Sequence, residues 1–141
     1  MTGTAEALSY VDSTDRITPE MLRGFFSDWP TPPSAETHFR LLESSDEIVV
    51  AIDDETGNVV GFITALSDGL LSAHITFLEV LPSCRGRGIG QELMRRMLAK
   101  LRGLYAVDLV CNPELRPFYE RFGMKPSVAM TLRDRARQSG A

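Results

Sequence analysis

A short run near the middle of the chain, Arg85-Gly86-Arg87-Gly88-Ile89-Gly90-Gln91, combines alternate glycines with two arginines. A strand-like segment, residues 75–80, precedes it, and a strongly helical segment, residues 91–101, follows it. Glycine has no Cβ, so the backbone can come close to a ligand, and the first turn of a helix presents unpaired N–H groups at the positive end of its dipole. With the two guanidinium groups, this arrangement predicts a binding site for a phosphorylated ligand.

Two common phosphate-binding motifs do not fit this run. The dinucleotide fingerprint G-x-G-x-x-G needs its third glycine where Gln91 stands. Asp108 does follow about 20 residues downstream, as that fingerprint requires, but it lies inside an apolar run, and too little chain remains for a doubly wound sheet. A Walker A loop is excluded because no Gly-Lys-Ser/Thr sequence is present.

The remaining pattern, Arg85-x-x-Gly88-x-Gly90, resembles the Q/R-x-x-G-x-G/A signature of the GNAT superfamily of acetyl-CoA-dependent N-acetyltransferases. A second motif follows about 30 residues later: Asn112, and then a helix with Phe118-Tyr119-x-x-x-Gly123-Met124, is similar to the family's Asn and Phe-Tyr-x-x-x-Gly-Phe. Methionine replaces the final phenylalanine, an exchange that an apolar position tolerates. The resemblance covers roughly residues 46–132, and the first 45 residues match only in layout.

The resemblance implies which groups hold acetyl-CoA, as a co-substrate. The N–H of Leu78 would face the thioester oxygen, and Val80, beyond Glu79, would face the pantetheine arm. Asn112 would hydrogen-bond the pantetheine chain between the fourth and fifth strands; the alternative is that Asn112 only caps a helix. The amides that would wrap the pyrophosphate are those of Arg85, Gly86, Arg87, Gly88, Ile89, Gly90 and Gln91.

Three side chains are candidates for the proton transfers that acetylation of an amine requires. The resemblance implies that Tyr119 lies near the sulfur and protonates the leaving thiolate; the alternative is a packing aromatic. Glu79 stands in an apolar strand end, where burial would raise its pKa and suit a general base; the alternative is a carboxylate paired with an arginine. His74 is a candidate because histidine is the side chain most often used as a base near neutral pH, but it lies about 13 Å from Leu78 along the strand and would need a relaying water.

The acceptor is suggested by position and by charge. Trp29, within a proline-rich loop, lies where the family forms one wall of the acceptor site; the alternative is a core anchor. Residues 1–70 carry 3 basic and 13 acidic side chains, and residues 71–141 carry 12 basic and 6 acidic ones. A basic half suits a polyanionic coenzyme and an acidic half suits a cationic amine; the alternative is that the halves only neutralise each other.

Three functions remain open at this point. The first is an N-acetyltransferase that moves the acetyl group to a primary amine of a small molecule, by direct attack in a ternary complex. The second is a protein or peptide N-acetyltransferase, and the third is a non-catalytic acyl-CoA-binding sensor on the same fold. The motif at Gly88 serves all three functions, whereas Tyr119 favours the two enzymes.

Composition narrows the setting. The 141 residues suit one domain with one sizeable core. A net charge of −4 without a basic stripe argues against binding of nucleic acid. The sequence has no apolar run of 18 residues, so we expect no membrane span. Residues 1–10 show no signal peptide. Two cysteines, Cys84 and Cys111, form neither a metal spacing nor a disulfide framework, so we expect no metal and a cytoplasmic location.

The expected elements form one N-acetyltransferase domain, residues 1–132, with a polar, frayed tail at 133–141. The order β-α-α-β-β-β-α-β-α-β predicts an α/β fold with a mixed sheet and helices on both faces, the GNAT layout. A homodimer is expected, because a last strand with Met130 and Leu132 would leave a sheet edge to cover. Strands are expected at 7–11, 48–52, 59–66, 73–80, 105–111 and 128–132, and helices at 18–29, 34–42, 89–101 and 114–122.

Overall fold

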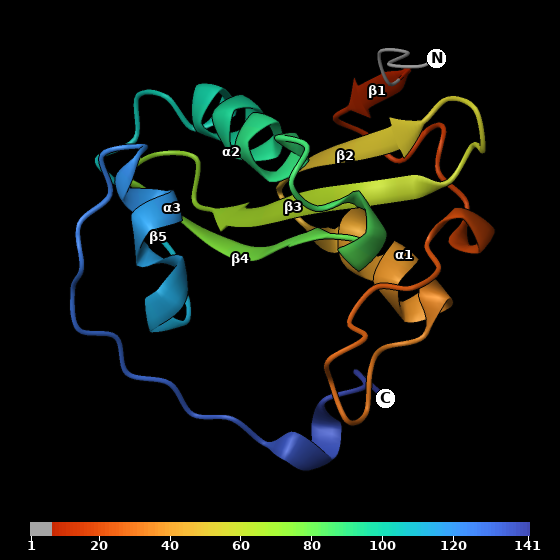
Figure 1. Cartoon of the computed structure of the whole chain (residues 1–141). Helices are drawn as coiled ribbons and strands as arrows, with labels where there is room; N and C mark the ends of the chain where they lie inside the picture. The colour runs from red at the N-terminus through yellow and green to blue at the C-terminus, as the bar shows by residue number, and fades with distance from the viewer. Residues whose placement is uncertain (1–6) are drawn as a thin grey trace.

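The computed structural model describes residues 7–141, which form one mixed five-stranded sheet with helices on both faces (Figure 1). Neighbouring strands are antiparallel except for the last pair, β4 and β5, which are parallel. A parallel pair needs a crossover, and the helix that follows the glycine run provides it. In sheet order the strands are β1 (Leu8–Val11), β2 (Glu47–Asp53), β3 (Val59–Ser67), β4 (Ser72–Val80) and β5 (Ala106–Asp108).

Three α-helices and four short 3-10 turns complete the fold. Ser34 begins the first helix by accepting the N–H of Thr37 at 3.1 Å, which satisfies one of the free N–H groups of its first turn. The α-helices are α1 (Ala35–Ser44), α2 (Ile89–Lys100) and α3 (Arg116–Glu120), and the turns are η1 (Pro19–Met21), η2 (Pro82–Cys84), η3 (Pro113–Leu115) and η4 (Arg135–Arg137). No helix in the described part of the chain is long and apolar enough to span a membrane.

Two apolar cores lie on opposite faces of the sheet. Val49 and Ala51 of β2 pack in the core that α2 covers, whereas Val50 and Ile52 pack in the core that Leu42 of α1 covers. Successive strand residues point to opposite faces, so the continuous apolar sequence of β2 follows from burial on both sides. The mixed α/β class that the sequence predicts is therefore the class observed.

The first predicted helix, residues 18–29, is wrong. Only the 3-10 turn η1 forms, with Pro19 in its first position. Beyond it the backbone enters the left-handed region at Gly24 (φ +91) and Phe26 (φ +59), which a right-handed helix cannot include. The segment is instead an irregular loop whose Phe25 and Phe26 are buried in the core beneath α1.

The predicted last strand, residues 128–132, is also wrong within this chain. Residues 125–133, called the arm from here on, are extended, exposed and outside every strand (Figure 1, blue). The end of the chain is not frayed as expected, because η4 forms and the Thr31 N–H donates to Gln138 Oε1 at 3.0 Å.

Two further elements are shorter than predicted. The strand expected over 105–111 is limited to β5, Ala106–Asp108, because its pairing with β4 ends there. The helix expected over 114–122 is divided into the turn η3 and the helix α3. Pro117 has no N–H, so it can stand only in the first turn of α3.

Candidate active site

The end of β4 has an unpaired edge toward β5. Pairing between the two strands stops at His74 and Asp108, six residues before β4 ends at Val80. The N–H of Leu81 donates to Val60 at 2.9 Å, and hydrogen bonding alternates along an antiparallel pair. The N–H groups of Leu78 and Val80 therefore point away from β3, toward the β5 side, which is the orientation that their predicted role requires.

The glycine run lies directly beyond this edge. Gly86 and Gly88 have φ of +82 and +80, and a Cβ on either would meet nothing within 4 Å. Glu92 is the first residue of α2 whose N–H bonds back, to the Gly88 carbonyl at 3.0 Å. Among the described residues, no acceptor meets the N–H groups of Gly88, Gly90 and Gln91. These three donors are thus available to an anion.

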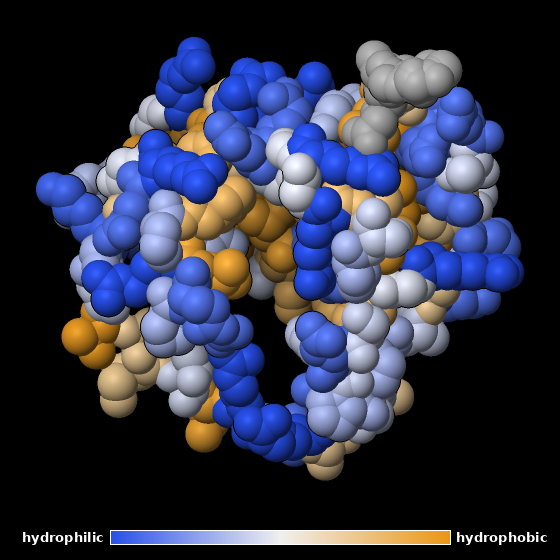
Figure 2. Space-filling model, in the orientation of Figure 1, coloured by the Kyte–Doolittle hydropathy of each residue, from blue (hydrophilic) through white to orange (hydrophobic). Residues whose placement is uncertain are grey.

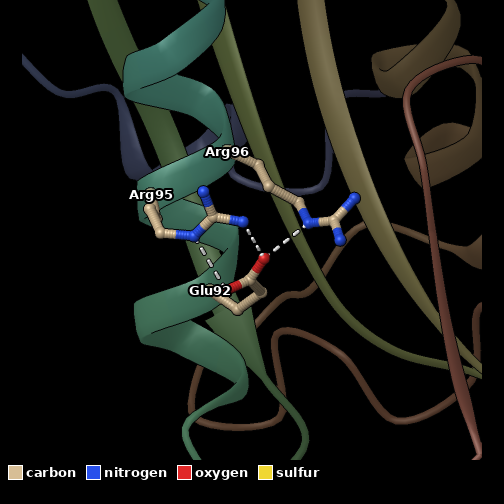
Figure 3. Close-up of polar contacts among 3 residues, drawn as sticks. All are labelled: Glu92, Arg95 and Arg96. Atoms are coloured by element: carbon tan, nitrogen blue, oxygen red, sulfur yellow. Dashed lines mark hydrogen bonds and ion pairs between the residues drawn. The ribbon is translucent and has the colours of Figure 1, made fainter.

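Charges around the run favour that anion. Arg85 and Arg87 are exposed, and Arg85 Nε donates to the Val80 carbonyl at 3.1 Å, which places it over the end of β4. Glu92, in the first turn of α2, would repel a phosphate, but Arg95 and Arg96 both bind its carboxylate (Figure 3). Hydrogen bonds from Arg95 first, then from Arg96, lower the pKa of Glu92 to about 2. The two arginines therefore neutralise the charge of Glu92 beside the glycine run.

Phe118 lies between the glycine run and Tyr119 and contacts both. A Cβ on Gly90 would lie 3.8 Å from Phe118 Cζ and 3.7 Å from Val80 Cγ2, so the start of α2 lies between β4 and α3. The Phe118 and Tyr119 rings pack edge to face, with centroids 4.9 Å apart. Burial raises the pKa of the half-buried Tyr119 phenol to about 12, with a smaller effect from Cys111. The phenol is therefore protonated at any working pH.

Asn112 stands at the start of η3 and does not cap it with its side chain. Its carbonyl accepts the Leu115 N–H at 2.9 Å, whereas its amide makes no hydrogen bond to any described residue. Of the two interpretations of Asn112, a side-chain cap is excluded. Asn112 is exposed, so its amide is available to a ligand.

Glu79 lies between the end of β4 and the loop that precedes α1. Its two carboxylate oxygens accept the N–H of Phe26 at 3.1 and 2.9 Å. Burial raises the pKa of Glu79, the Phe26 N–H and Arg85 oppose that rise, and Asp28 adds to it. No ion pair joins Glu79 to an arginine among the described residues, so the paired alternative is not the one observed.

Three aromatic rings pack together at the loop that this carboxylate binds. The ring centroid of Trp29 lies 4.8 Å from that of Phe26 and 6.0 Å from that of Phe77, and Trp29 and Phe77 are both half-buried. Trp29 therefore helps to anchor the loop and remains partly exposed, and its contact with an acceptor stays a prediction. The sequence analysis did not identify Phe77 or the N–H of Phe26 as parts of the site. Gly24, two residues before Phe26, was the one sequence signal that the predicted helix over 18–29 would be interrupted.

His74 is not part of this group. It is exposed near the start of β4, paired with Asp108 of β5, whereas Glu79 lies near the other end of the same strand. The structure connects most of the other candidates through contacts: Arg85 binds the Val80 carbonyl, Phe118 lies between Gly90 and Tyr119, and Glu79 binds the loop that carries Trp29. It leaves His74 apart from them.

The match to the acetyltransferase (GNAT) family model spans residues 14–124. The chain belongs to the GNAT acetyltransferase family. It is 31% identical over 119 residues to a glucosamine 6-phosphate N-acetyltransferase of Oryza sativa subsp. japonica, covering 73% of this chain and 72% of that one. It is 36% identical over 90 residues to a chloroplastic serotonin N-acetyltransferase of the same species, covering 60% of this chain but only 44% of the relative.

A solved structure matches the entire chain. The crystal structure of a candidate acetyltransferase from Deinococcus radiodurans R1 is 44% identical, with a TM-score of 0.93, and covers 100% of this chain and 99% of that one. The arm is included in that coverage.

Acetyl-CoA, which the family uses, fits the residues present. The free N–H groups of the glycine run and the arginines beside it suit a pyrophosphate, and the unpaired edge of β4 with the Asn112 amide suits an amide-containing chain. Within residues 7–141, no three His, Cys, Asp or Glu side chains are grouped as metal ligands would be.

Proposed function

We propose that this acetyltransferase moves an acetyl group from acetyl-CoA to a primary amine of a small molecule, by direct attack while both substrates are bound. The observation that carries the proposal is the unpaired edge of β4, which leads to the glycine run and includes Glu79 one residue before the strand ends. Acetyl-CoA supplies the activated acetyl group as a thioester. The protein then has to position it, polarise it and manage one proton.

The backbone of β4 performs the first two tasks. The N–H of Leu78 is a donor aimed at the β5 side of the strand, where the thioester oxygen would lie, and a fixed donor there stabilises charge that develops in the transition state. The N–H of Val80, the Asn112 amide and the glycine run hold the rest of the coenzyme. Such positioning raises the effective concentration of the reacting groups.

Glu79 and the rings beside it receive the amine. An alkylamine reaches the site as its ammonium form, because a lysine-like pKa is about 10.4. A carboxylate in a partly buried position attracts that cation, and its raised pKa makes it a better proton acceptor. Trp29 and Phe77 offer aromatic faces to the same cation. Glu79 is therefore assigned as the base and Trp29 as an acceptor contact.

Tyr119 serves the leaving sulfur. Its phenol, with a pKa of about 12, stays protonated and donates a hydrogen bond to the developing thiolate. A thiol has a pKa of about 8.5, which is lower than that of the phenol. The phenol therefore stabilises the thiolate by a hydrogen bond without giving up its proton completely, and solvent supplies the proton that completes the thiol.

Isotope-labelled acetyl transfer tests the proposal on a panel of small amines and of peptides with a free N-terminus or lysine. Label on small amines supports the proposal, and label on peptides alone indicates a protein acetyltransferase. Acetyl-CoA binding without transfer to any member indicates an acyl-CoA sensor.

A further inference from the structure

A pocket of about 260 Å³ lies between the C-terminal half of α2 and the edge strand β1. Three strand spacings, about 14 Å, separate β1 from β4 in the sheet. The part of α2 that lines the pocket begins with Arg95, about 10 Å along the helix from Gly88. This cavity, called the β1–α2 pocket from here on, is therefore separate from the glycine run and the unpaired edge of β4. Both surfaces are visible in relation to the sheet in Figures 1 and 2.

The charged walls of the β1–α2 pocket are mainly cationic. Its lining includes the cations Arg95, Arg96 and Lys100 of α2 and one carboxylate, Asp12, directly after β1, which together give a net charge of +2. Lys100 Nζ binds Asp12 at 2.9 Å and Glu47, outside the lining, at 3.3 Å. The hydrogen bond to Asp12 raises the pKa of Lys100, so its ammonium stays charged. The pocket therefore favours an anion.

The two arginines keep donors that no described residue uses. Glu92 accepts from Nε and one Nη of Arg95 but only from Nε of Arg96 (Figure 3). The other Nη of Arg95 and both Nη groups of Arg96 meet no acceptor within the described residues. Arg96 Cζ lies 4.5 Å from the ring centroid of Tyr10, a contact that holds the guanidinium at the pocket wall. Guanidinium groups with free N–H groups suit phosphate and carboxylate oxygens.

We propose that the β1–α2 pocket is a second binding site, for a small phosphate monoester with an apolar body, and that its occupation weakens acetyl-CoA binding. A phosphate monoester carries close to two negative charges at neutral pH, which match the net charge of the lining. The Tyr10 ring and the buried Val49 offer an apolar surface to the body of the ligand. The volume is slightly below the range of about 300–1,000 Å³ that is usual for ligand pockets, so the ligand is small.

The effect on acetyl-CoA follows from Glu92, and this step rests on the proposed function. Glu92 lies in the first turn of α2, directly after the glycine run, and Arg95 and Arg96 balance its charge. A phosphate in the pocket competes with Glu92 for these two arginines. Glu92 then repels the pyrophosphate of the coenzyme more strongly, because like charges at short range destabilise each other. The coupling is reciprocal, so bound acetyl-CoA weakens the second ligand by the same factor.

Phenyl phosphate is the probe, and nitrogen-15 NMR of the full chain reports where it binds. We expect saturable shifts of the amides of residues 10–12 and 95–100 and of the Nε groups of Arg95 and Arg96. By calorimetry, saturating phenyl phosphate should weaken acetyl-CoA binding about fivefold. Benzyl alcohol, which has the ring without the phosphate, should cause neither effect. Acetyl-CoA is also titrated alone, so failure of the coenzyme site is distinguished from failure of the pocket.

Matched lysine variants locate the effect. Lys100→Gln removes a cation of the pocket without changing the partners of Glu92, and it should weaken phenyl phosphate binding about tenfold while acetyl-CoA alone binds as in the wild type. Lys125→Gln removes the same charge from the exposed start of the arm and should behave as the wild type. Ala99→Leu fills the pocket without a change of charge and should also weaken the probe. It provides the same test if Lys100→Gln is unstable.

Three outcomes overturn the proposal. The first is the absence of shifts at residues 10–12 and 95–100 of the wild type. The second is binding in the pocket that leaves the affinity for acetyl-CoA unchanged. The third is shifts confined to residues 85–91, with a loss of acetyl-CoA affinity that Lys100→Gln retains in full, because phenyl phosphate then competes directly at the glycine run.

Discussion

Glu79 fixes the backbone of Phe26, a residue 53 positions earlier, through a carboxylate that accepts one N–H on both oxygens. Phe26 has φ +59, a left-handed conformation that costs a residue with a Cβ about 1–2 kcal/mol. Such strain persists where the surroundings determine it, and here the carboxylate and the aromatic core do so. The proposed base and the loop that carries Trp29 are therefore one structural unit.

Glu79→Gln separates the two roles of this carboxylate. The Gln amide oxygen can still accept the Phe26 N–H, so the loop should keep its conformation, but the side chain can no longer take a proton. We expect kcat/KM to fall about 10²-fold, with little change in acetyl-CoA affinity. In the wild type, kcat/KM should fall as pH drops through a Glu79 pKa that burial holds above its usual value. This acid limb should be absent in the variant.

Glu92→Gln is the matched control for that experiment. Glu92 is also a carboxylate with two partners, but it binds Arg95 and Arg96 on the outer side of α2 (Figure 3). Its replacement should leave the acid limb in place. An unchanged pH profile in Glu79→Gln would exclude Glu79 as the base.

The elements that the sequence predicted well are those whose structure depends on residues close together in the chain. The continuous apolar runs of β2 and β3, the turn between them and the apolar stripe of α2 can all be recognised from neighbouring residues. The glycine run was found in the same way, because left-handed positions and a helix start need glycine locally. These features place the residues that we propose to bind the phosphates of the coenzyme.

The features that the sequence did not reveal depend on distant contacts. The segment 18–29 has a good helix start at Thr18 and Pro19, yet its course is set by Phe26 meeting Glu79 across the fold. The strand pattern at 128–132 is real, but the arm pairs with no strand of the described chain. His74 and Glu79 lie on one strand, and only the end of pairing with β5 shows which of them faces the site.

Gly88→Val tests the coenzyme site. The substitution forces a β-branched residue into φ +80 and puts methyl groups where the loop is open. Acetyl-CoA at a hundredfold excess over Kd should stabilise the wild type by about 2.7 kcal/mol and raise its Tm, and the variant should show no such rise. NAD and ATP should raise neither Tm.

Gly57→Val is the control for backbone strain. Gly57 has φ +76 and equally open surroundings, but it lies in the turn between β2 and β3. Its variant should lose similar stability yet keep the full shift with acetyl-CoA. Loss of the shift in both variants would attribute the effect to folding and leave Gly88 without a specific role.

Tyr119→Phe tests the donor to the leaving sulfur. The phenylalanine keeps the ring packed against Phe118, so stability and acetyl-CoA affinity should be nearly unchanged. We expect kcat to fall about 10²-fold, a loss of about 2.7 kcal/mol of transition-state stabilisation. Tyr105→Phe, at an 89% exposed tyrosine, should have wild-type kinetics. A wild-type kcat in a folded Tyr119→Phe protein would leave Tyr119 a packing role only.

His38 should make the protein sensitive to acid, although it lies outside the site. Its ring is 1% exposed among Phe25, Phe26 and Phe62, and neither nitrogen has a partner in the described chain. Burial lowers the pKa of His38 from 6.5 to about 4. Between these values the unfolded chain binds more protons than the folded protein, so stability falls as pH falls. At pH 5, His38 should reduce the free energy of unfolding by about 2 kcal/mol relative to pH 7.

His38→Leu should remove that part of the acid sensitivity. Urea unfolding at pH 7 and pH 5 should show a difference between the two pH values that is about 2 kcal/mol smaller in the variant than in the wild type. At pH 7 the variant should be at least as stable, because a buried polar ring without partners is replaced by an apolar side chain. His74→Gln changes the exposed histidine and should leave the wild-type pH dependence intact. Equal losses in His38→Leu and wild type between pH 7 and pH 5 would mean that His38 is protonated as readily in the folded protein as in the unfolded chain.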